Sequence, residues 1–179
     1  KMLYNQAQLL HVYALAYSRF NLNAYKRVAN EIAEYVLREM TSSEGAFYSA
    51  TDADSEGEEG LFFTWTFEEL ENELSDDDLA FVMEVYGVTR DGNFEGKNIL
   101  HLKNFPDLNR KEDSDDWLKH LSVIKAKLYS LRTQRLSPLR DEKIITGWNS
   151  MMISALVIAG HLLQSPKFLQ AAERAADYL

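Results

Sequence analysis

Five carboxylates stand within eight residues of the acidic run at residues 52–59, the stretch of this chain best equipped for chemistry. Like charges at this density repel one another, so stability alone does not call for them. Such a loop is typical either of a solvated hairpin tip or of a polar site for a hydroxyl-rich ligand, and both interpretations stay open. Tyr48 and Trp65 flank the run and favour a sugar, since sugars stack on aromatic rings while carboxylates accept their hydroxyl protons. We therefore predict catalytic roles for Asp52 and Asp54, and substrate binding for the two aromatic residues.

The same run imitates a calcium-binding loop without completing one. Asp52, Asp54 and Glu56 alternate as the first ligands of an EF-hand do, and Gly57 follows in the expected place. The closing bidentate acid would fall at Phe63, which has no ligand oxygen. No metal and no cofactor is therefore predicted.

Two further polar stretches are candidates for acid/base work. Residues 140–143 read Arg-Asp-Glu-Lys, a set that could move protons or could pair with itself in a solvated loop. The glycine-bearing stretch 92–102 carries Glu95 with Asn93 and Asn98 on either side. From these stretches we predict Glu95 and Asp141 as catalytic, and Asn93, Asn98 and Arg140 as substrate-binding.

The four histidines give weaker indications. His11 and His161 lie within charge-free stretches, where a histidine buried in the core is expected. His101 follows the glycine-bearing stretch and is the best placed of the four for chemistry.

Composition limits the possible partners and compartments. The net charge is −9, from 28 acidic and 19 basic residues, and no Lys/Arg cluster stands out, so neither nucleic acid nor an anionic membrane is expected as a partner. There is no cysteine, which excludes disulfides and thiolate chemistry within the chain and fits a reducing, cytoplasmic compartment. No apolar run reaches membrane-spanning length, and no signal peptide opens the chain.

The two ends of the chain resemble each other. Residues 2–18 and 144–166 contain no Asp, Glu, Lys or Arg, and an amphipathic helical pattern follows each of them. A shift of 144 positions lays Asn5 on Asn149, and a shift of 143 lays Tyr25 on Phe168. A charge-free helix is expected to be buried all round, with its charged successor covering one side. An inner helix followed by an outer one, used twice, predicts an α/α toroid, unless two good helical hairpins coincide by chance.

The start of each charge-free helix carries an aromatic residue and an asparagine. Tyr4 and Asn5 hold this place in the first repeat, and Trp148 and Asn149 in the second. In α/α barrels the N-terminal ends of the inner helices line the ligand cleft, so we predict all four as substrate-binding. The alternative is that the asparagines cap or bridge neighbouring backbone groups.

A mixed stretch separates the two predicted hairpins. Residues 46–49 and 61–65 are expected to pair as a β-hairpin, and a capping box at Thr66 opens a short helix. Asp76 to Asp78 are expected to cap the next helix, which stops at Gly87. The predicted fold is mainly α, a partial α/α toroid with a small antiparallel β excursion. One domain is expected over residues 1–179, with helical hairpins at about 2–40 and 146–179, a β-containing insertion at about 46–102 and a helix at about 115–135.

Five sequence blocks resemble one protein family. They are residues 1–7, 47–60, 86–89, 92–101 and 140–149, and they are similar to the thioredoxin-domain-containing family of spermatogenesis-associated protein 20 and its bacterial relatives. The resemblance implies an α/α barrel of the six-hairpin glycosidase type, related to N-acylglucosamine 2-epimerases, behind a thioredoxin-like domain that this chain lacks. The family usually has Asp at the position of Asn5 and His at the position of Leu139.

The function expected from these patterns is acid/base chemistry on a sugar, of the epimerase or glycosidase type, by Asp52, Asp54, Glu95 and Asp141. The alternative is a non-catalytic binding or scaffold module for the upstream thioredoxin-like domain. The expected partners are a sugar and that domain. If the barrel is incomplete, uncovered apolar surface should also make the segment self-associate.

Overall fold

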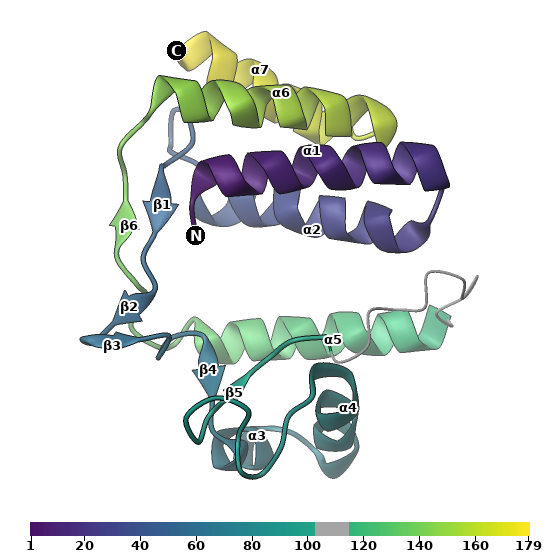
Figure 1. Ribbon diagram of the computed structural model, residues 1–179, viewed down its shortest axis with the longest axis vertical. Coiled ribbons are helices and arrows are strands. Elements are labelled where there is room, and N and C mark those ends of the chain that lie inside the picture. Colours follow the sequence, from purple (N-terminus) through teal and green to yellow (C-terminus); the bar gives the residue numbers. More distant parts are fainter. Residues whose placement is uncertain (103–114) are drawn as a thin grey trace. The chain divides into compact units, whose positions relative to one another are not determined.

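The computed structural model describes residues 1–102 and 115–179, and these form two compact units (Figure 1). Unit 1 comprises Lys1–Asp52 and Leu139–Leu179, and unit 2 comprises Ala53–Pro138. The predicted fold class, mainly helical with a few short antiparallel strand pairs, is confirmed. Each unit has its own core, and the single domain expected over 1–179 stays a prediction.

Unit 1 consists of two helical hairpins. α1 (Leu3–Phe20) and α2 (Asn23–Glu39) form the first, and α6 (Thr146–Leu162) and α7 (Pro166–Tyr178) form the second, within the predicted ranges. α1 packs against both α2 and α6, and α7 packs against α6. α1 and α6 run in the same direction, while α2 and α7 run back beside them (Figure 1). The two hairpins are thus arranged as a repeat.

Small residues let the helices of unit 1 approach closely. Alanines from all four helices are buried in its core, and Phe168 of α7 is 2% exposed. Gly160 in α6 shows how close the contact is, because an added Cβ atom would lie 2.6 Å from Leu169 Cδ2 on α7. Burial of these apolar surfaces is the main force that holds the hairpins together.

The charge-free helices are not buried all round in this chain, and each leaves apolar surface uncovered. α1 exposes Leu9, Val12 and Leu15, with Val12 61% exposed, and α6 exposes part of Val157. Within unit 1, each of these helices packs against the second helix of its own hairpin and against the other charge-free helix. For the same reason His161 is exposed rather than buried as predicted.

Short strands cross the ends of the unit 1 hairpins. β1 (Ala50–Thr51) pairs antiparallel with β6 (Arg140–Asp141), and Met2 forms a bridge to Ala50 on the other side. The pairing continues for one more hydrogen bond, from the Asp52 N–H to the Leu139 carbonyl at 2.8 Å.

Unit 2 contains the acidic run, and the β-hairpin predicted around that run is wrong. The run forms its own hairpin, in which β2 (Asp54–Ser55) pairs with β3 (Glu58–Glu59). Glu56 and Gly57 form its turn with φ of 55° and 81°, a conformation typical of tight hairpin turns. Because this turn closes the run on itself, the flanking segments pair elsewhere, β1 with β6, and β4 (Thr64–Trp65) with β5 (Asn98–Ile99).

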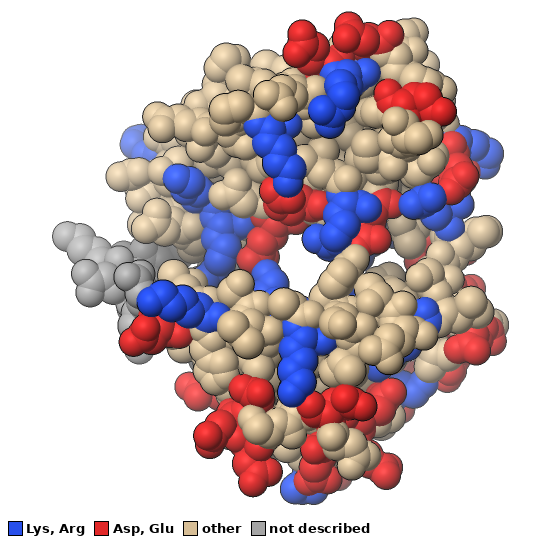
Figure 2. Space-filling model, turned by 180° about the vertical axis from the view of Figure 1, so that it is seen from behind, with Lys and Arg blue, Asp and Glu red and all other residues tan. Residues whose placement is uncertain are grey.

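Three helices complete the described part of unit 2, namely α3 (Phe67–Glu73), α4 (Asp76–Tyr86) and α5 (Asp115–Arg132). The capping box of Thr66 and Glu69 is confirmed. The cap of α4 is Ser75, and the aspartates predicted as caps fill its first turn, where they favour the helix dipole. Acidic side chains gather over the lower part of the molecule in Figure 2, the part that α3 and α4 occupy in Figure 1.

The core of unit 2 is built from Trp65, Phe67, Leu70, Val82, Ile124 and Leu128, which come from β4 and all three helices. α5 ends at Arg132, three residues earlier than predicted, so that the following residues turn back. Over the described residues, no helix combines the length and the apolar character that crossing a membrane requires.

Candidate functional site

The segment 47–50 of unit 1 forms hydrogen bonds to residues at or near the starts of α1, α6 and β6. The backbone N–H of Phe47 donates to Asn149 Oδ1 at 2.8 Å, and Asn149 Nδ2 donates to the Phe47 carbonyl at 2.9 Å. Two residues on, the Ser49 carbonyl accepts from the Leu3 N–H at 2.8 Å. The Ser49 N–H donates to the Asp141 carbonyl at 3.1 Å. The helix starts and the polar strand β6 are therefore held side by side.

An aromatic pair lies in the first turns of α1 and α6. The rings of Tyr4 and Trp148 meet edge to face, with 4.9 Å between their centroids and 66° between their planes. Both side chains are half-buried, and they occupy equivalent positions of the repeat. Asn5 beside them is exposed, whereas Asn149 is fully buried. The Asn149 amide also donates to the Ile145 carbonyl at 3.2 Å, so the bridging alternative describes this residue.

Asp141 is an ionised carboxylate at this end of unit 1. Lys143 donates to it twice, from Nζ to Oδ2 at 3.1 Å and from the backbone N–H to Oδ1 at 3.3 Å. These hydrogen bonds, with a smaller one from Ser49, lower the pKa of the Asp141 carboxyl. A carboxyl group with a lowered pKa is ionised at neutral pH, so it accepts hydrogen bonds from hydroxyl groups and is a poor general acid.

Arg140 and Tyr48 complete the unit 1 group. The guanidinium lies over the Tyr48 ring, 4.4 Å from its centroid, and pairs with Glu142 at 2.6 Å. It also donates to the Glu39 carbonyl at 3.2 Å. The stretch 140–143 is thus self-paired, one of its two predicted alternatives. Asp52 is exposed at the end of β1.

Unit 2 holds the remaining predicted site residues. Asp54 is exposed in β2, and Glu95 is exposed with φ of 47°. Trp65 is 4% exposed, and the Arg135 guanidinium covers its ring at 4.0 Å from the centroid, so no open face is left for a sugar. The substrate-binding role predicted for Trp65 therefore has no free ring surface.

The two asparagines of unit 2 are committed to the backbone. Asn98 is fully buried, accepts from the Thr89 N–H at 2.9 Å and donates to the Thr89 carbonyl at 3.0 Å. Asn93 makes the same pair of bonds with Ile99, at 2.8 and 3.0 Å. Their amides shape the loop around β5.

Of the predicted residues, unit 1 thus contains Tyr4, Asn5, Tyr48, Asp52, Arg140, Asp141, Trp148 and Asn149, and unit 2 contains Asp54, Trp65, Asn93, Glu95 and Asn98.

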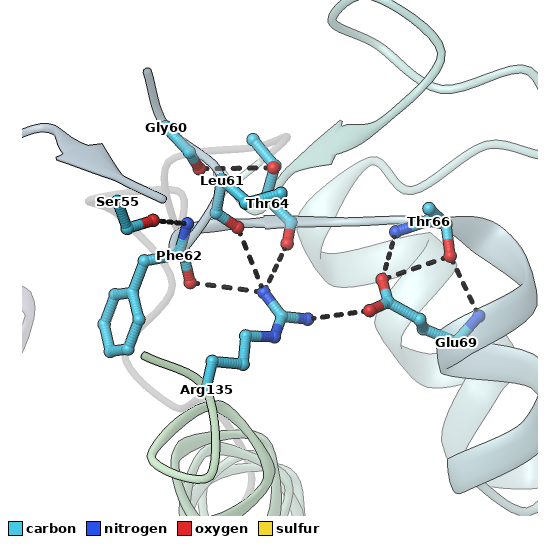
Figure 3. Close-up of polar contacts among 8 residues, drawn as sticks. All are labelled: Ser55, Gly60, Leu61, Phe62, Thr64, Thr66, Glu69 and Arg135. Carbon is cyan, nitrogen blue, oxygen red and sulfur yellow. Dashed lines mark hydrogen bonds and ion pairs between the residues drawn. The ribbon is translucent and has the colours of Figure 1, made fainter. Parts of the chain in front are cut away.

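Arg135 is a central residue of unit 2 that the sequence did not single out (Figure 3). Its Nη1 donates to the carbonyls of Leu61, Phe62 and Thr64 at 3.4, 3.2 and 2.7 Å. Its Nη2 pairs with Glu69 at 3.3 Å, within the capping box of α3. The fork of donors on arginine suits this role, which a lysine could not fill. The sequence feature that could have indicated this role is the position of Arg135, a basic residue between the end of the predicted helix and the Ser137-Pro138 break.

A cavity of about 230 Å³ adjoins Arg135 within unit 2. Its walls include Ser55, Glu56, Phe62 and Lys97, so the acidic run contributes to it. Among the described residues, no group of three or more His, Asp or Glu side chains is placed to hold a metal ion.

Fold and site together define a mainly helical protein in which two hairpins bring aromatic and carboxylate side chains to one end. Over its whole length the chain is similar to spermatogenesis-associated protein 20 of Homo sapiens, with 30% identity over 207 aligned residues. The protein of the same name from Rattus norvegicus and an uncharacterised protein of Caenorhabditis elegans are also 30% identical over the whole chain. The chain spans only 26% to 28% of the length of these relatives. No family model matches. The resemblance to proteins of this name is confirmed, while the α/α barrel and the thioredoxin-like domain stay predictions.

Proposed function

We propose that unit 1 forms part of an α/α barrel that binds a sugar where α1 and α6 begin. The observation that carries this proposal is the Tyr4–Trp148 ring pair, which the segment 47–50 ties to the backbone of Asp141. Aromatic rings contact the apolar face of a sugar, and an ionised carboxylate accepts its hydroxyl hydrogens. The positive ends of two parallel helices point toward the same place.

Asp141 and Asp52 are the proposed pair for acid/base chemistry on the bound sugar. Both belong to the same strand pair, since Asp141 lies opposite Ala50 and Asp52 follows two residues later. Asp141 is assigned the role of base because a base must be deprotonated, and the bonds from Lys143 favour that state. In an epimerase a base removes a proton from carbon, whereas a glycosidase needs a second carboxyl group as acid.

Titration calorimetry with N-acetylglucosamine and its 2-epimer N-acetylmannosamine tests this proposal. Asp141→Asn removes the acceptor charge and should weaken sugar binding roughly tenfold, the scale of one charge-assisted hydrogen bond. Asp177→Asn, at the exposed end of α7, is the matched control and should bind like the parent chain. If neither sugar binds the parent chain at millimolar concentration, the sugar proposal is wrong.

A non-catalytic role is favoured by two positions at the same end of unit 1. Leu139 is 75% exposed beside Asp52, where the resemblance leads one to expect His, and the exposed Asn5 stands where Asp is usual. Neither side chain can transfer a proton. A scaffold for the thioredoxin-like domain that the resemblance implies would need no such group. Binding of sugar without conversion of one epimer into the other, together with measurable binding of a separately produced thioredoxin-like domain, would favour the scaffold.

A further inference from the structure

We propose that the cavity of unit 2 binds a small zwitterion of the amino-acid class, with its carboxylate at Lys97, its amine at Glu56 and an aliphatic side chain against Leu61, Phe62 and Leu136. This site lies wholly within unit 2 and is independent of the proposed sugar site.

Each neutral side-chain hydroxyl of the cavity already makes a hydrogen bond within the protein. The Thr64 hydroxyl donates to the Gly60 carbonyl at 3.2 Å. The Thr66 hydroxyl donates to Glu69 at 3.1 Å and accepts the backbone N–H of the same residue. Ser55 Oγ accepts from the Phe62 N–H at 3.1 Å. A ligand that offers only hydroxyl groups would find few partners in the walls that it could not also find in water.

Two charged walls are also satisfied internally. Arg135 gives Nη1 to three carbonyls and Nη2 to Glu69 (Figure 3). Glu69 receives Thr66 and Arg135, so both of its oxygens are occupied. These two side chains cancel each other in charge and form a rigid back wall rather than a binding group.

Two further side chains of the cavity wall, Lys97 and Glu56, carry opposite charges. Within residues 1–102 and 115–179, Lys97 Nζ pairs with Glu58 at 3.3 Å, and the ammonium group carries three donor hydrogens. Glu56 is exposed at the hairpin turn, and no ion pair to it occurs among residues 1–102 and 115–179. A ligand that carries an anionic and a cationic group gains a charge-assisted hydrogen bond at each, about twice as strong as a neutral one.

The acidic character of unit 2 favours a zwitterion over a simple anion as the ligand of the cavity. Unit 2 contains nineteen acidic and ten basic residues, so its field repels a ligand with net negative charge. A zwitterion has no net charge and avoids this repulsion. The apolar walls and the volume of about 230 Å³ suit one aliphatic side chain.

Nuclear magnetic resonance titration of the 179-residue chain tests the class of ligand with four probes. L-leucine carries both charges, 4-methylpentanoate lacks the amine, 3-methylbutylamine lacks the carboxylate, and glucose carries neither. L-leucine should bind about tenfold more tightly than either singly charged analogue, with shifts confined to the cavity residues. Equal or tighter binding of glucose would overturn the proposed class, and no binding of L-leucine at 10 mM, about a hundredfold above typical metabolite affinities, would overturn the site.

Two charge-removing variants assign the ends of the ligand. Glu56→Gln should weaken L-leucine roughly tenfold and leave 4-methylpentanoate unchanged, because the amine has lost its partner. Lys97→Gln should weaken 4-methylpentanoate, because the carboxylate has lost its partner. It should leave 3-methylbutylamine unchanged. Glu68→Gln, exposed on α3, is the control and should alter neither. If Glu56→Gln and Lys97→Gln weaken all probes equally, or none, the assignment of the two ends is wrong.

Discussion

Unit 1 and unit 2 differ in their net charge and in the contacts that hold each of them together. Unit 1 has nine acidic and nine basic residues and buries alanine-rich helix faces against one another. Unit 2 has nineteen acidic and ten basic residues, so it carries the whole net charge of −9. Its loops are held by polar side chains that bind the backbone, above all Arg135 and Asn98. Both units thus bury an apolar core, and unit 2 adds side-chain bonds to the backbone.

The largest effect is expected from a core truncation in unit 1. Phe168→Ala removes a side chain that is 2% exposed, and it should lower the free energy of unfolding by about 3–5 kcal/mol. Phe20→Ala removes the same ring from a position 59% exposed and should cost less than about 1 kcal/mol. Urea unfolding followed by circular dichroism measures both. Equal losses would show that the unit 1 core is not packed as described.

The buried asparagines test the feature that the two units share. In each unit a fully buried asparagine pairs with both backbone groups of a single residue, Asn149 with Phe47 and Asn98 with Thr89. Asn149→Ala or Asn98→Ala leaves those groups without partners and should cost about 1–3 kcal/mol. Asn5→Ala, at an exposed position, should cost almost nothing. Chemical denaturation measures all three, and a large loss for Asn5→Ala would contradict the assignment.

The Arg135→Lys variant tests whether the stability of unit 2 depends on the shape of the arginine side chain or only on its charge. Lysine keeps the charge but cannot serve three carbonyls and a carboxylate at once, so a loss of about 1–2 kcal/mol is expected. The control is Arg90→Lys, because the pair of Arg90 with Glu71 is exposed and should contribute less than about 0.5 kcal/mol. The melting temperatures of the two variants should differ accordingly. Equal values would mean that charge alone is enough.

A smaller effect should appear at low pH in unit 2. His120 bonds to Asp78 at 2.9 Å, and this hydrogen bond lowers the pKa of the Asp78 carboxyl. Because the folded pKa lies below the unfolded one of about 3.9, the contribution to stability is complete above that pH and is lost as the pH falls through the folded value. Asp78→Asn should thus be less stable than the parent at pH 6, and the difference should vanish in acid. Urea unfolding between pH 2 and 6 measures it, and a difference independent of pH would contradict this cause.

The smallest effect concerns calcium. Phe63 stands where a calcium loop needs its closing acid, and its ring packs edge to face on Phe62 instead. Calcium should therefore change neither tryptophan fluorescence nor melting temperature at micromolar concentration. A saturable response in that range would be the contrary result.

Much of unit 1 could be predicted because its helices carry a continuous apolar pattern that ends at clear signals, such as Asn21 in the left-handed conformation. The strands could not be predicted, because strands of two residues are too short to show the alternation of apolar and polar residues. The role of Arg135 depends on carbonyls more than seventy residues earlier in the chain, which no local pattern reveals. Burial of Asn149 but not Asn5 likewise depends on which side of each helix has a neighbour, so equivalent positions of the repeat differ.

The bond between Asp52 and Leu139 makes unit 2 an insertion in the topological sense. The chain leaves unit 1 and returns to it at hydrogen-bonded neighbours, so residues 53–138 form a closed excursion. Closing so long a flexible loop costs about 3 kcal/mol more than closing a tight turn. Folded unit 2 removes that cost, because Arg135 binds Leu61 and the Gly60 N–H binds the Ala53 carbonyl, near the two ends of the excursion. We expect the excursion to close first and the two hairpins to meet afterwards, and a two-residue turn in its place should let them meet without it.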